Sequence, residues 1–337
     1  MKHSKHPHNG STRPNWLPLM LLMTVMCLRV SLLVGQPARE NDDFAYIVEL
    51  YYRNADNLNE IEAELDSFSN RYPNSEYGQY VQYLRGNIAL RKGDFEQSSG
   101  IYQELMEQEL HPDILPDVYL NYAISSYYLQ DHALGLSLLK DLEKAATHPW
   151  YLYQVNVWRG RIKAMQELWL SAEDEYRKAL AYDPGEVLFD YFQALLALHK
   201  DAEAQAILDT LSVASPDHGK YHGAWLDQLL TEAQYDMFDE YISGLDSLVT
   251  FTPPFILLRI RKELDQENYA AAKALLPKLT ETSETATYYR AVMLNQDGFS
   301  AEADALFRSL LNSREGDLAV LSYLERLKIL HNTDPGS

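Results

Sequence analysis

The sequence predicts an all-α protein, a solenoid of about eight stacked helix pairs that ends in one further C-terminal helix. An apolar stripe at positions i, i+4 and i+7 recurs along the chain with a mean period of 34.6 residues, about the length of one helix pair. The chain has only 15 Gly and 14 Pro in 337 residues, too few for a turn-dense sandwich or propeller. Short polar breaks separate the helical stretches, as a repeating helical array requires.

Each apolar stripe begins with a small or compact residue and continues with larger apolar ones, which is the pattern of one buried helix face. The seven stripes are Ile61/Leu65/Phe68, Ser98/Tyr102/Leu105, Gly135/Leu139/Leu142, Ala172/Tyr176/Ala179, Ala204/Leu208/Leu211, Ala272/Leu276/Leu279 and Ala303/Phe307/Leu310. Twelve residues before the stripe, four units have another small residue, at Gly86, Ala123, Gly160 and Ala291. A small residue on each of two antiparallel helices lets their backbones approach, so these positions predict close helix crossings.

Turn residues fall where this period places them. Polar breaks within pairs occur at Lys92-Gly93-Asp94, Gln130-Asp131 and Asp297-Gly298. Pro184 and Pro216 follow second helices, where proline ends a helix. The unit from Tyr221 to Pro253 keeps the length but has Phe238 or Tyr241 where the small residue is expected, so its register stays open.

Two segments, Tyr83 to Leu105 and Val157 to Pro184, resemble tetratricopeptide repeats. The second matches the family pattern of small residue, aromatic, Ala, aromatic, Ala and Pro at Gly160, Trp169, Ala172, Tyr176, Ala179 and Pro184. The resemblance implies a right-handed solenoid over residues 39–330, with Asp317 to Leu330 as a terminal capping helix and residues 331–337 as a disordered tail. It also implies a concave groove, lined by the first helix of each pair, that holds peptides or partner helices.

The N-terminus has the pattern of an export signal. Residues 1–16 carry basic residues and no acid, and an apolar run from Leu17 to Leu28 follows. Because Arg29 interrupts the run and no clear cleavage pair follows, residues 1–38 are either a cleaved signal peptide or an uncleaved signal anchor. The segment FSNRYPNSEY, Phe68 to Tyr77, resembles the join found in exported bacterial repeat proteins of the outer-membrane assembly lipoprotein and Tol-Pal coordinator type. We therefore expect a periplasmic or outer-membrane location, with inner-membrane anchoring as the alternative.

Charge and cysteine content exclude several classes of protein. The 29 Lys and Arg against 49 Asp and Glu give a formal charge of −20, which disfavours nucleic acid as a partner. Cys27 is the single cysteine of the chain, so the chain has no internal disulfide and no thiolate metal cluster. We expect protein partners, and contact with a membrane only through the N-terminal segment if it is uncleaved.

The sequence has no pattern typical of a catalytic site. It lacks phosphate-binding, dinucleotide-binding, nucleophile-elbow and zinc-protease motifs, so we predict a protein that is not an enzyme and that needs no cofactor. His218 and His222 have the four-residue spacing of a helical metal site. Because Pro216 precedes them and Gly219 separates them, we expect a loop with two surface histidines and no metal.

Counting from the small residue of each first helix gives the candidate groove residues. They are Tyr83, Asn87, Arg91, Asn121, Tyr127, Gln154, Arg161, Arg261 and Tyr288. Tyr and Arg are favoured in protein interfaces, which supports a scaffold for partner proteins, although such tyrosines also pack between helices.

Some repeat proteins of this family hold a C-terminal carboxylate with two asparagines and three basic residues. Asn87 and Asn121 match the asparagine positions, but the basic positions hold Tyr83, Gln154 and Trp158. We therefore expect no such clamp, and a neutral or basic peptide suits the acidic chain better. Two rival functions stay open, a glycan-binding module that uses Tyr and Trp faces and an enzyme whose site is assembled from separate loops.

Overall fold

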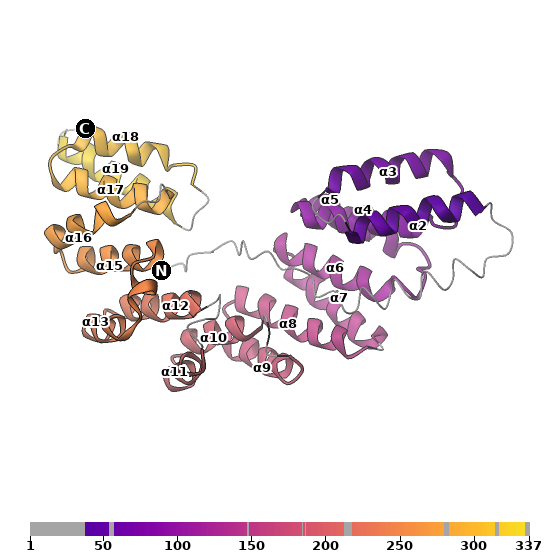
Figure 1. Cartoon of the computed structure of the whole chain (residues 1–337), viewed down its shortest axis with the longest axis horizontal. Helices are drawn as coiled ribbons and strands as arrows, with labels where there is room; N and C mark the ends of the chain where they lie inside the picture. Colours follow the sequence, from indigo (N-terminus) through magenta and orange to yellow (C-terminus); the bar gives the residue numbers. More distant parts are fainter. Residues whose placement is uncertain are drawn as a thin grey trace. The chain divides into compact units, whose positions relative to one another are not determined.

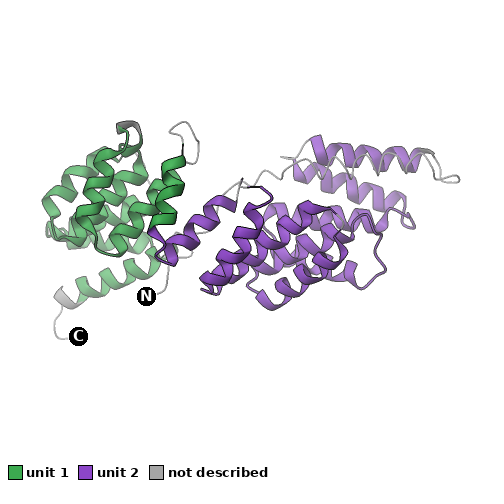
Figure 2. Cartoon of the chain, turned by 90° about the horizontal axis from the view of Figure 1, so that it is seen from below, with its two compact units in different colours: residues 1–12, 202–337 green, residues 13–201 purple. Residues whose placement is uncertain are grey.

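The computed structural model describes residues 38–53, 57–146, 148–183, 185, 187–211, 218–279, 283–313 and 317–333. All regular structure in these ranges is helical, and consecutive helices pack against each other, so the predicted all-α fold class is confirmed (Figure 1). The proposed leader lies outside these residues except for Ala38, and Pro184 and Pro216 also lie outside them. The described residues form two compact units that meet in sequence at Asp201 and Ala202 (Figure 2).

The N-terminal unit, described between residues 38 and 201, consists of four helix pairs and one more helix. Its helices are α2 (Ala38–Arg53), α3 (Leu58–Arg71), α4 (Gly78–Lys92), α5 (Phe95–Met106), α6 (Leu115–Tyr128), α7 (His132–Ala145), α8 (Pro149–Met165), α9 (Trp169–Leu180) and α10 (Val187–Ala197). Each first helix packs on its own second helix and on the second helix of the pair before it. This arrangement is the stacking that a helical repeat predicts.

The C-terminal unit, described between residues 202 and 333, has three helix pairs between two flanking helices. Its helices are α11 (Asp201–Thr210), α12 (His218–Thr231), α13 (Tyr235–Gly244), α14 (Ser247–Thr250), α15 (Pro253–Asp265), α16 (Tyr269–Leu275), η1 (Leu276–Lys278), α17 (Glu284–Gln296), α18 (Ser300–Ser309) and α19 (Leu318–Thr333). Helix α19 packs on α17 and α18. It ends at Thr333, three residues into the segment predicted to be a disordered tail.

The turns inside the pairs repeat one backbone conformation. A single residue after each first helix from α4 to α17 has a positive φ, and these residues are Gly93, Gln130, Glu167, His199, Ala233, Glu267 and Gly298. Only two of the seven are glycine, so the other five turns accept a strained left-handed residue. The aspartate that follows Gly93 and the one that follows Gln130 each cap the next helix, at 3.0 and 3.1 Å from a backbone N–H. The predicted breaks at these turns are confirmed.

Most of the predicted apolar stripes are buried. The leading residues Ala172, Ala204, Ala272 and Ala303 have no exposed surface. Leu276 differs from the prediction because it is half-buried. Helix α16 ends at Leu275 and continues as the 3-10 turn η1, which contains a proline, so the stripe loses its helical register there.

The predicted close crossings depend on glycine at two places. A Cβ atom on Gly86 would lie 2.7 Å from Tyr102 Cε1, and a Cβ atom on Gly160 would lie 2.6 Å from Tyr176 Cδ1. Both tyrosines are almost fully buried on the second helix of the same pair. The rings therefore occupy the space that a side chain on the first helix would need.

Candidate functional site

The candidate site is the face formed by the first helices of the pairs, and in the N-terminal unit it begins with a carboxylate on α6. The Tyr83 hydroxyl on α4 donates a hydrogen bond to Asp117 Oδ2 at 3.1 Å, and the Tyr151 hydroxyl on α8 donates to Asp117 Oδ1 at 2.8 Å. The three residues are spaced 34 apart, so the repeat period places them side by side on three successive first helices. One carboxylate thus links α4, α6 and α8.

Asn87 and Asn121 form a second link between α4 and α6. Asn87 Oδ1 accepts hydrogen bonds from Asn121 Nδ2 at 2.8 Å and from the Tyr102 hydroxyl at 2.5 Å. Asn87 is 6% exposed and Tyr102 is fully buried. This amide therefore joins two stacked pairs and is already occupied by groups of the protein itself.

Further along the same face, Trp158 on α8 lies between several predicted groove residues. Its indole N–H donates to Gln154 Oε1 at 3.2 Å, and its ring meets Tyr127 edge-on at 5.4 Å. The Arg161 guanidinium lies over the indole at 4.7 Å. Because Trp158 is only 7% exposed, its aromatic face is covered and is not free to stack on a sugar.

The two arginines of this face have different surroundings. Arg161 Nε and NH2 donate to Asp190 Oδ2 on α10 at 3.0 and 2.8 Å. Arg91 lies over the ring of Tyr51 at 4.6 Å, and its buried NH1 group has no hydrogen-bond partner among the described residues. Arg161 is thus neutralised within the protein, whereas Arg91 keeps an unused donor.

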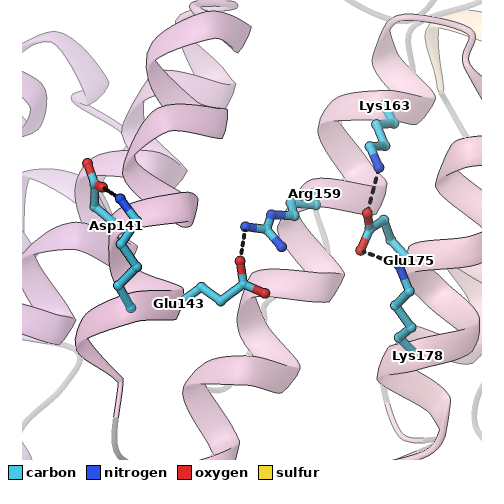
Figure 3. A network of polar contacts seen from close by, with 7 residues as sticks. Asp141, Glu143, Arg159, Lys163, Glu175 and Lys178 are labelled. Carbon is cyan, nitrogen blue, oxygen red and sulfur yellow. Dashed lines mark hydrogen bonds and ion pairs between the residues drawn. The ribbon is translucent and has the colours of Figure 1, made fainter.

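The basic residue nearest to a clamp position points elsewhere. Arg159 NH2 donates to Glu143 Oε2 on α7 at 2.6 Å, and Lys163 Nζ donates to Glu175 Oε1 on α9 at 2.5 Å (Figure 3). These two basic side chains of α8 therefore bind carboxylates of second helices, unlike Arg161 of the same helix. The three basic positions of the clamp hold Tyr83, Gln154 and Trp158, all of which bond or pack inside the face.

In the C-terminal unit the first helices α12, α15 and α17 line an open pocket of about 620 Å3. Its wall includes Gly219 and Gly223 of α12, Leu258 and Arg261 of α15, and Tyr289 of α17. Arg261 NH1 donates to Asp227 Oδ1 at 2.6 Å, again across a separation of 34 residues. A Cβ atom on Gly223 would meet nothing within 4 Å, so this part of the pocket is open space.

Tyr288 and Tyr289 lie on different sides of α17. The predicted residue Tyr288 meets the ring of Phe307 on α18 at 5.7 Å, so it faces the second helix of its own pair. Tyr289 lines the pocket instead. Counting along the sequence thus selected Tyr288, whereas its neighbour Tyr289 lines the pocket.

Several residues of the face were not among the sequence candidates, including Asp117, Tyr151, Asp190 and Tyr289. A signal for the first two was present, because Tyr83, Asp117 and Tyr151 follow the same 34-residue interval as the repeat. Asp190 was hidden because it follows Arg161 by 29 residues, an interval that does not match the repeat period, since Arg161 lies near the end of α8 and Asp190 near the start of α10. Polar residues that recur at the repeat interval of 34 therefore indicate contacts between neighbouring pairs, and counting from the small residue of each first helix misses these contacts.

Burial raises the pKa of Asp117 above its ordinary value of 3.8, and the hydrogen bonds from Tyr151 and Tyr83 act in the opposite direction. Burial also raises the pKa of Tyr83 well above 10, so its hydroxyl stays a donor at neutral pH. The folded protein therefore holds an ionised Asp117 at a cost in stability once the pH is above the pKa of the folded state. That cost is absent below about pH 3.8, where the carboxyl is protonated in both states.

The expectation that His218 and His222 lie on a surface loop is wrong. Helix α12 begins at His218, and the two side chains are 7% and 6% exposed rather than lying on a surface loop. The two Nε2 atoms are 2.9 Å apart, and His222 Nδ1 is 2.5 Å from the Tyr241 hydroxyl on α13. Gly219 does not break the helix, and the buried histidines on either side of it anchor this turn by packing inward.

Within the described residues, no three His, Cys, Asp or Glu side chains come together in a way that could hold a metal ion. The same part of the chain contains no helix whose length and apolar character would let it span a membrane.

No protein-family model matches this sequence, and no curated protein matches it. Among solved structures, the fold is similar to a crystal structure of a tetratricopeptide repeat protein from Parabacteroides merdae. The TM-score is 0.53 and the sequence identity 15%, and the match covers 75% of this chain and 99% of the other. The chain therefore has a fold of the tetratricopeptide repeat type.

Proposed function

We propose that this protein is a non-catalytic scaffold that holds segments of partner proteins against the first helices of its pairs. The observation that carries the proposal is the pocket of about 620 Å3 lined by three successive first helices in the C-terminal unit. Apolar side chains of α15 and Tyr289 line it together with the Arg261–Asp227 ion pair, a mixture that suits an anchored side chain with polar neighbours.

The face of the N-terminal unit supports the same function by its rigidity. Tyr83, Asn87 and Gln154 are held by hydrogen bonds within the face, so little side-chain freedom is lost when a partner binds there. Replacing these residues would damage the stack itself. Variants that test binding must therefore change residues that the stack does not need.

Gly223→Leu is such a variant. A leucine there would fill open space in the pocket and would favour the helix, so we expect peptide binding to fall about tenfold or more while the fold is kept. The measurement is binding of the full chain to an array of random-sequence peptides. Gly100→Leu is the matched control, because Gly100 lies exposed on the second helix α5 and its Cβ position also meets nothing within 4 Å.

Two results would contradict the proposal. One is that the wild-type chain captures no peptide. The other is that Gly223→Leu binds as well as Gly100→Leu, which would separate peptide binding from this pocket. The pocket would then have no role in holding partners.

We also propose that the protein works in the periplasm or at the outer membrane of a bacterium, with an uncleaved anchor in the inner membrane as the alternative. The basic, then apolar, N-terminus and the likeness of residues 68–77 to exported repeat proteins support this proposal. The second support is the weaker one, since Phe68 and Tyr77 also have a packing role around Phe44. An alkaline phosphatase fused after Ser337 should be active in a bacterial host and inactive when residues 1–38 are deleted; equal activity would contradict export.

A further inference from the structure

Asp117 differs from Asp190, another carboxylate of the first-helix face in the N-terminal unit, in what neutralises it. Asp190 is bound by Arg161 through two nitrogens at 2.8 and 3.0 Å. Asp117 is bound by two tyrosine hydroxyls, and none of the described basic residues forms an ion pair with it. Its hydrogen bonds are therefore satisfied while its charge is not.

Linking the pairs does not require a charge at this position. The Asn87–Asn121 bond joins the same two helices, α4 and α6, with neutral amides. An asparagine at position 117 could accept a tyrosine hydroxyl bond without the penalty of a partly buried carboxylate. The charge of Asp117 thus has no use within the ligand-free protein.

Tyrosines surround this carboxylate. Besides Tyr83 and Tyr151, the field of Asp117 reaches Tyr51 and Tyr52 on α2, where burial is the main cause of a raised pKa and Asp117 adds to it. Tyr51 and Tyr83 are each 4% exposed, and the Arg91 guanidinium lies over the Tyr51 ring, while Tyr52, Tyr151 and Asp117 keep contact with solvent. A carboxylate beside several aromatic rings is a favourable environment for an organic cation.

We propose that Asp117 binds a lysine or arginine side chain of a partner segment, with Tyr52 and Tyr151 packing beside it. This inference rests on the proposed function and specifies the chemistry of the partner. The net charge of −20 agrees with a basic segment, since the field of the whole chain attracts it. The charge of this site is negative, whereas a clamp for a C-terminal carboxylate is positively charged.

The test uses small probes that imitate one side chain each. Saturation-transfer NMR on the full chain would compare N-acetyl-lysine methylamide and N-acetyl-arginine methylamide with the uncharged N-acetyl-norleucine methylamide. We expect at least one basic probe to bind about tenfold more tightly than the norleucine probe at low salt, and the difference to shrink at about 0.3 M salt.

Asp117→Asn should remove that preference, and Glu104→Gln should keep it within about twofold. Glu104 is an exposed carboxylate on the second helix α5, so the control changes the net charge equally. Asp117→Asn should fold at least as stably as the wild type, which thermal unfolding would verify. The salt dependence of the wild-type chain provides a second measurement that needs no variant.

The proposal is overturned if the basic probes bind no better than the norleucine probe, or if Asp117→Asn and Glu104→Gln bind them equally. Its failure is distinguishable from failure of the proposed function, because the peptide array is a separate measurement. The chain could capture peptides through the pocket and yet show no preference for the lysine or arginine probe. That result would support the scaffold function and exclude the cation site.

Discussion

Gly160→Ala is expected to lower the free energy of unfolding of the N-terminal unit by about 1–2 kcal/mol, although alanine is the better helix former. The new Cβ atom would lie 2.6 Å from Tyr176 Cδ1 and 2.9 Å from Tyr176 Cζ. Because that ring is 2% exposed and packed on all sides, it cannot move aside without disturbing the core. Overpacking of this kind costs about 1–3 kcal/mol, which exceeds the helix-propensity gain of about 1 kcal/mol. Urea unfolding followed by circular dichroism measures the change.

The matched control for this prediction is Gly100→Ala on α5. No atom lies within 4 Å of its Cβ position, so only the helix propensity remains and the variant should be more stable by up to about 1 kcal/mol. In the double variant Gly160→Ala/Tyr176→Leu the ring is gone, so the two changes should be less destabilising together than their sum. If Gly160→Ala stabilised the protein as Gly100→Ala does, the close crossing of α8 and α9 would not depend on the missing side chain.

The repeat and its crossings could be predicted from the sequence because they depend on local rules. A small residue that recurs twelve positions before an apolar stripe has one simple physical use, the close approach of two helices, and Gly86 and Gly160 have that use. The turns were also predictable where glycine or aspartate marks them. Ala233 and Glu267 show the limit, since both have a left-handed backbone that their residue types do not announce.

The site was less predictable, because the sequence does not distinguish a polar residue that faces solvent from one that bonds to the neighbouring helix pair. Asn87 and Arg161 were expected to face a partner, and the structure shows them bonded to Asn121 and Asp190. Long polar side chains on a stacked face find each other first, since an unpaired group there is costly. What remains for a partner is therefore a group whose charge is not paired within the protein, as we propose for Asp117, and that can be seen only when all the contacts are known. The division into two units is likewise set by tertiary contacts and has no marker in the 34-residue period.

The histidine pair of α12 carries the other large expected effect, a loss of stability of the C-terminal unit in mild acid. Burial, and then the neighbouring His218, lower the pKa of His222 from 6.5 to about 4. A base with a lowered folded-state pKa contributes full stability above its unfolded pKa of 6.5 and loses it as the pH falls toward 4. The loss approaches about 3 kcal/mol, because each unit of pKa corresponds to about 1.4 kcal/mol.

The geometry explains why His222 resists protonation. The two Nε2 atoms are 2.9 Å apart, so only one of them can carry a proton directed at the other, and the second must accept it. His218 Nδ1 is buried and has no hydrogen-bond partner among the described residues, so an imidazolium N–H there would have no acceptor. Charging His222 is therefore expected to disturb the packing of α12 against α13.

Hydrogen exchange measured by mass spectrometry at about pH 7 and about pH 4.5, corrected for the intrinsic pH dependence of exchange, would locate the effect. We expect protection in α12 and α13 to fall in the more acidic solution, and His222→Gln to reduce that fall because glutamine does not titrate and can still bond to the Tyr241 hydroxyl. His132→Gln on α7 removes a histidine from the other unit and should leave the pH dependence of α12 and α13 unchanged. Equal protection of these helices at both pH values in the wild-type chain would contradict the prediction, because lowering the pH would then not loosen the packing around His222.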